Sequence, residues 1–147
     1  MTDSALMALT EDELDVLVSI AIHRAEVLAE IGSPSAKEAW REVKTYEEQL
    51  AAITRVDDIP GGVARVGAVT AALAAGERQE ASRLASRFLA EAGLPSERQQ
   101  AIGQAFREDH DRLALRFPAL AKSGRLAELD EWRSLVARGP RVFPVAA

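Results

Sequence analysis

The two histidines are the first candidates for chemistry, because imidazole is a common metal ligand and general base. His23 and Glu26 have an H-x-x-E spacing, which places both side chains on one face of a helix. A di-iron helical bundle needs two E-x-x-H units and two further glutamates, and this chain lacks the second unit. We therefore expect His23 and Glu26 to lie on a solvated face without a metal.

The second histidine lies in the run 108–111, Glu-Asp-His-Asp, which is dense in potential metal ligands. Four consecutive residues of a helix point in four directions, so they cannot close on one ion. The chain has no cysteine, which excludes thiolate catalysis and disulfides. Gly61, Gly62 and Gly67 lack the Gly-Lys-Ser/Thr of a phosphate-binding loop. The sequence predicts no catalytic residue, no metal and no cofactor.

Arginines suggest a different chemistry, the binding of an anion or of nucleic acid. Ala72 and Gly76 have the A-x-x-x-G spacing of a helix-turn-helix, so residues 68–88 form a degenerate candidate for that motif. Polar residues occupy two positions where the motif needs apolar ones. The candidate contacts on the following helix are Arg78, Arg83 and Arg87.

The charge distribution makes nucleic acid an unfavoured partner. The net charge is −5. Residues 1–76 carry 6 basic and 13 acidic side chains, whereas residues 77–147 carry 12 basic and 10 acidic ones. A general nucleic-acid binder is basic overall or on one clear face, and this chain is acidic overall.

The segment Leu14–Ile31 organises the rest of the chain. On a helical wheel its apolar residues cover roughly two thirds of the circumference, whereas a surface helix needs a stripe only about 100° wide. This helix should be either the centre of a bundle or a helix whose second face meets another chain. Thr10 and Glu13 form a T-x-x-E capping box at its start, and Gly32 should end it.

A possible interface follows from this wide apolar arc. Arg24 projects into the arc, and we expect its head to reach water or a carboxylate, with an anion or partner site as the alternative. The C-terminal tail is apolar and could join the same surface. The candidate interface residues are Val16, Ile20, Arg24, Val27, Ile31 and Phe143.

Apolar periodicity and turn residues predict an all-α fold of about six helices, arranged in antiparallel hairpins as a single compact bundle. Ser35 and Glu38 should form a second capping box, and Pro60 should end regular structure before the third helix. One helical domain should cover 1–139, and an extended apolar tail 140–147. The helices after the first are expected at 35–55, 63–75, 77–92, 96–117 and 126–137, with a short segment at 119–122.

The function predicted from these features is a protein–protein interaction module with a regulatory, adaptor or assembly role and no catalysis. A homodimer is among the assemblies it would form. A DNA-binding regulator is the alternative. The acidic residues of the first two helices leave a metal- or nucleotide-dependent helical enzyme as a third hypothesis.

The longest apolar run, 16–22, is too short to cross a bilayer, and the N-terminus lacks the basic region of a signal peptide. We therefore expect a cytoplasmic protein that does not enter a membrane.

Overall fold

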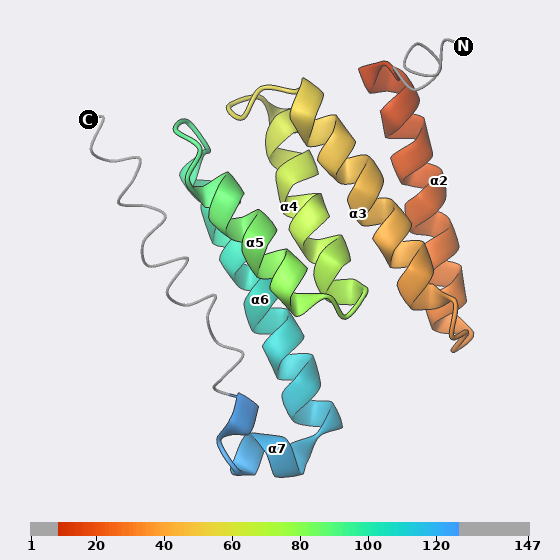
Figure 1. The fold of residues 1–147 in the computed structure, drawn as a ribbon, viewed down its shortest axis with the longest axis vertical. Coiled ribbons are helices and arrows are strands. Elements are labelled where there is room, and N and C mark those ends of the chain that lie inside the picture. Colours follow the sequence, from red (N-terminus) through yellow and green to blue (C-terminus); the bar gives the residue numbers. More distant parts are fainter. Residues whose placement is uncertain (1–8, 127–147) are drawn as a thin grey trace.

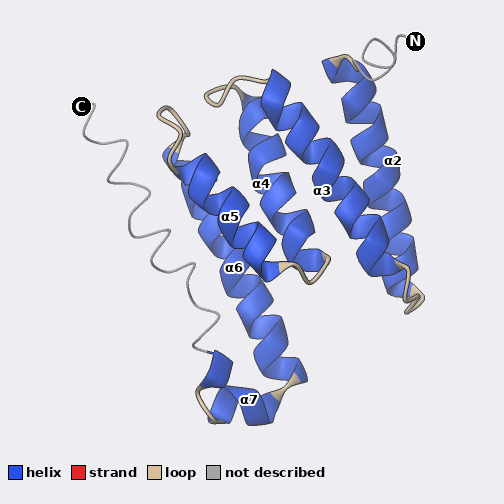
Figure 2. Cartoon of the chain, viewed as in Figure 1, coloured by secondary structure: helices blue, strands red, loops and turns tan. Residues whose placement is uncertain are grey.

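The computed structural model describes residues 9–126, and all regular structure in this range is helical (Figure 2). The expected all-α class is confirmed. The predicted helix 126–137, apart from its first residue, and the tail 140–147 lie outside the described residues. The six helices of the described range are α2 (Glu11–Glu30), α3 (Ala36–Ile53), α4 (Ile59–Ala74), α5 (Arg78–Leu89), α6 (Ser96–Arg116) and the short α7 (Pro118–Lys122).

Consecutive long helices run antiparallel, with α2, α3 and α4 side by side and α5 and α6 packed beyond α4 (Figure 1). The central helix is α4, which contacts α3, α5 and α6. α2 lies at the outer edge of the described array and packs mainly on α3. The expectation that Leu14–Ile31 forms the centre of the bundle is therefore wrong.

The central position of α4 follows from the small side chains on its buried faces. Ala64, Ala68 and Ala72 are fully buried, and Ala71 is 1% exposed. Small residues let neighbouring helix axes approach closely on more than one side. The larger side chains of the main core come from the surrounding helices and include Leu14, Leu50, Leu84, Phe88, Ile102 and Phe106.

α4 also begins earlier than the sequence suggests. Pro60 lies in its first turn instead of ending regular structure, because a proline there loses no needed hydrogen bond and has a helical φ already fixed. Gly61 and Gly62 are buried in the same turn. A Cβ atom on Gly61 would overlap the carbonyl oxygen of Arg55, so glycine lets the loop between α3 and α4 fold onto the helix.

We expect Gly61→Ala to lower the free energy of unfolding by about 2 kcal/mol, since the overlap is with backbone that cannot simply rotate away. Gly62→Ala in the same helix is the matched control. A Cβ there comes no closer than 3.0 Å to its neighbours, which are side-chain atoms of the flexible Arg98, so most of the helix preference for alanine, about 1 kcal/mol, should be retained. Urea unfolding followed by circular dichroism measures both. Equal shifts in the two variants would contradict the backbone overlap.

The first capping box is confirmed and the second is wrong. The Thr10 amide donates to Glu13 Oε1 at 2.8 Å, and the Glu13 amide donates to Thr10 Oγ1 at 3.1 Å. Ser35 instead has a helical backbone, with ψ of −5°, and makes no side-chain cap. Its own amide donates to Ser33 Oγ, so the chain has already turned into the helix before Ser35.

Candidate functional site

Four of the predicted interface residues form an apolar stripe on the outer face of α2. Val16, Ile20, Val27 and Ile31 are between 42% and 71% exposed. The opposite face of the helix buries Leu14, Val18, Ala21 and Ala25 against the rest of the array. We call the four exposed residues the α2 stripe.

The two other predicted interface residues differ from these four. Arg24 donates through Nη2 to Glu42 Oε1 of α3 at 2.5 Å, and both side chains remain well exposed. Arg24 thus has the carboxylate partner that the sequence suggested. It lies between Ile20 and Val27, in the seven-residue gap of the α2 stripe. Phe143 lies outside the described residues.

The three arginines of α5 are each engaged with a carboxylate. Arg78 makes two hydrogen bonds to Asp109 of α6, at 2.9 and 3.3 Å. Arg83 makes two hydrogen bonds to Glu80, at 2.9 and 2.7 Å. Arg87 lies 3.3 Å from Glu48 of α3, and its guanidinium carbon is 4.9 Å from the centroid of the Phe88 ring. These contacts tie α5 to α3 and α6.

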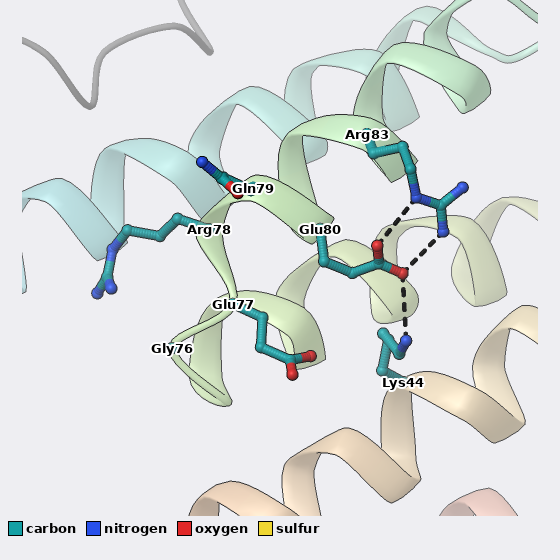
Figure 3. Close-up of a pocket in the computed structure, with 7 residues that line it drawn as sticks. All are labelled: Lys44, Gly76, Glu77, Arg78, Gln79, Glu80 and Arg83. Carbon is teal, nitrogen blue, oxygen red and sulfur yellow. Dashed lines mark hydrogen bonds and ion pairs between the residues drawn. The ribbon is translucent and has the colours of Figure 1, made fainter.

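A shallow hollow of about 860 Å³ lies between α3 and the start of α5. Figure 3 shows Lys44 and Arg83 converging on Glu80 there, with Arg78 pointing away from them. Hydrogen bonds from Arg83, assisted by Lys44, lower the pKa of Glu80 to about 2 against the opposing effect of burial. Positive charge in the hollow is therefore largely matched by its own carboxylates.

The turn between α4 and α5 is a helix cap. Gly76 has a φ of +78°, and its amide donates to Leu73 O while the Glu77 amide donates to Ala72 O. Ala72 is buried in the core, as a tight helix packing requires. The A-x-x-x-G spacing is thus accounted for by the end of α4.

A second cavity, of about 340 Å³, lies where α2, α3 and α4 meet, and we call it the Glu47 groove. Glu47 lines it and is only 5% exposed. Arg98 of α6 and Thr70 of α4 also contribute to its wall. Its apolar lining includes Ile22, Trp40, Val43, Val63 and Val66.

The Glu47 carboxyl group has neither a hydrogen bond nor an ion pair within the described part of the chain. It rests against Gly67, where any side chain would overlap it. Burial raises the pKa of Glu47 to about 7, and the negative charge of Asp15 adds to the increase. This carboxyl group therefore changes its charge near neutral pH, which an exposed glutamate does not.

The apolar spacing of residues 36–53 leaves either Tyr46 or Glu47 on the buried face of α3. The structure buries Glu47 and leaves Tyr46 partly exposed. An acidic residue on an apolar stripe is the pattern that marks a candidate site.

Across residues 9–126, no group of three or more histidine or acidic side chains is placed to hold a metal ion. In the same range, no helix is both long enough and apolar enough to span a bilayer. Comparisons of the chain with protein-family models, with curated proteins and with solved structures found no match.

Proposed function

We propose that this protein is a non-catalytic interaction module that assembles as a homodimer through the α2 stripe. The observation that carries the proposal is an apolar face on an edge helix that no element of residues 9–126 covers. Scattered exposed apolar residues are normal on a monomer, but these four lie on one helix at intervals of four, seven and four residues. These intervals keep all four side chains on one face of the helix, where a second helix would meet them together.

The spacing of the α2 stripe is also self-complementary. It reads the same in both directions about a midpoint between His23 and Arg24. Two antiparallel copies of α2 would therefore place Ile20 opposite Val27 of the second copy, and Val16 opposite Ile31. A two-fold dimer needs such a surface, because the same patch must match itself after rotation. Antiparallel helices also align their dipoles favourably.

The oligomeric state tests this proposal. Sedimentation equilibrium of the full chain over a range of concentrations should show a monomer–dimer equilibrium. Ile20→Glu should shift it to monomer, because a charge opposite Val27 would be removed from water in an apolar seam. Ser19→Glu, at an exposed position on the same helix outside the stripe, should leave the dimer intact. A native chain that stays monomeric throughout would refute the proposal.

A charge exchange tests the antiparallel register. Val27→Lys alone should also be monomeric. An equimolar mixture of Ile20→Glu and Val27→Lys should recover a dimer, since the antiparallel arrangement brings the new glutamate opposite the new lysine. Recovery with Ile20→Glu plus Ile20→Lys instead would indicate a parallel pair and contradict the proposed register.

A further inference from the structure

Glu47 is the one acidic side chain among the described residues that is both buried and without a partner. Asp109, the other buried acid of this range, receives two hydrogen bonds from Arg78. Buried carboxyl groups are ordinarily paired or hydrogen-bonded, because leaving them unmatched costs free energy. The Glu47 carboxyl group is therefore a candidate for pairing with a bound ligand.

The surroundings of Glu47 define what that ligand would be. The groove is open to solvent, and its volume of about 340 Å³ lies within the range of small-molecule sites. Its wall is mostly apolar, with Trp40, Ile22 and Val66 beside the single carboxyl group, and its other polar side chains are Thr70 and Arg98. An apolar wall with one acidic group complements a molecule with an apolar body and one cationic hydrogen-bond donor.

We propose that the Glu47 groove binds a small primary amine with an apolar or aromatic body, whose ammonium group donates hydrogen bonds to the Glu47 carboxylate. Gly67 leaves room for the carboxylate at the back of the groove. The Arg98 side chain, whose stem packs against Gly62, lies at one end of the wall. This proposal does not depend on dimer formation, because the α2 stripe and the groove use different residues of α2.

Binding of this ligand is coupled to a proton. The free carboxyl group is mostly protonated at about pH 6 and mostly ionised at about pH 8.5, because the pKa of Glu47 is about 7. Pairing with an ammonium group requires the ionised form, so binding at the lower pH must release a proton. Asp15 from α2 and Arg98 from α6 are the other charged groups that act on the groove. Arginine keeps its charge throughout this range.

Isothermal titration calorimetry of the full chain with phenethylamine tests the proposal. Binding should be about tenfold tighter at about pH 8.5 than at about pH 6, from the fraction of ionised Glu47. Titration at the lower pH in two buffers with different ionisation enthalpies should show release of about one proton per bound amine. At the higher pH almost no proton should be released.

Two variants and one neutral probe separate this site from general apolar binding. Glu47→Gln should weaken phenethylamine binding at least tenfold at about pH 8.5 and abolish the proton release. Glu48→Gln, which alters the adjacent glutamate paired with Lys44 and Arg87, should bind as the native chain does. Phenethyl alcohol should bind much more weakly than the amine. Equal binding of the alcohol, unchanged binding by Glu47→Gln, or no binding of the amine to the native chain would each overturn the proposal.

Discussion

Replacing Arg65 by methionine should lower the free energy of unfolding by about 3 kcal/mol, because it removes one partner of a buried ion pair. The Arg65 side chain is 7% exposed and makes two hydrogen bonds to Glu91, at 2.7 and 3.1 Å. It also donates to the carbonyl oxygens of Gly61 at 2.9 Å and Thr54 at 3.4 Å. One side chain thus joins α4 to the preceding loop and to the turn after α5.

Glu91 is about one-third exposed, so its carboxylate can return to water when Arg65 is removed. This places the expected loss at the lower end of the range for broken buried pairs. Arg55→Met is the matched control, since the Arg55 side chain is 76% exposed in its pair with Asp57, and exposed pairs contribute little. Urea unfolding measures both variants. If the two lose the same free energy, the Arg65 contacts do not hold the loops as described.

Periodicity predicted the class and order of the helices, but not which helix lies in the middle. A wide apolar arc suggested that α2 would be either central or in contact with another chain. The array places α4 in the centre, because alanines at 64, 68, 71 and 72 allow close packing on several sides. The width of the apolar arc on a helical wheel indicates how much of the helix surface other elements must bury. It does not say how many neighbours can approach the helix.

The turns show the same division between local and tertiary effects. Gly32 has a positive φ of +71°, as its predicted place at the end of the first helix requires. Ser35, which follows it, does not form the predicted cap of the next helix. A positive φ at the end of a helix is favoured by glycine itself, because glycine has no Cβ. A serine N-cap also requires an extended backbone at the serine, and the geometry of the preceding turn determines whether the backbone is extended there.

The candidate sites were predictable only in part for a related reason. That the stripe residues share one face follows from the sequence of α2 itself, whereas their exposure follows from the place of α2 at the edge of the array. The partners of the α5 arginines were not predictable, since Glu48 and Asp109 belong to other helices far along the chain. The Glu47 groove also needs three helices to enclose it, with Gly67 leaving space for the carboxylate. No single segment of the sequence carries that arrangement.

Glu47→Gln should stabilise the protein above neutral pH and remove a pH dependence that the native chain has. The pKa of Glu47 rises from 4.5 to about 7 on folding. The folded state therefore holds a proton that the unfolded state has lost, so the free energy of unfolding falls as the pH rises from 4.5 towards 7. The total loss is about 3 kcal/mol, reached just above pH 7. Glutamine does not ionise, so the free energy of unfolding of Glu47→Gln should lack this pH-dependent loss.

Urea unfolding at several pH values between about 4.5 and 8.5 measures this difference. Glu47→Gln and the native chain should have similar stability at the acidic end and diverge towards the alkaline end. Glu48→Gln should keep the native slope, because Glu48 is paired at the surface. A native curve parallel to that of Glu47→Gln would mean that the carboxyl group is solvated. A divergence would show that the chain retains a destabilising acid at neutral pH, which is characteristic of residues kept for binding and not for folding.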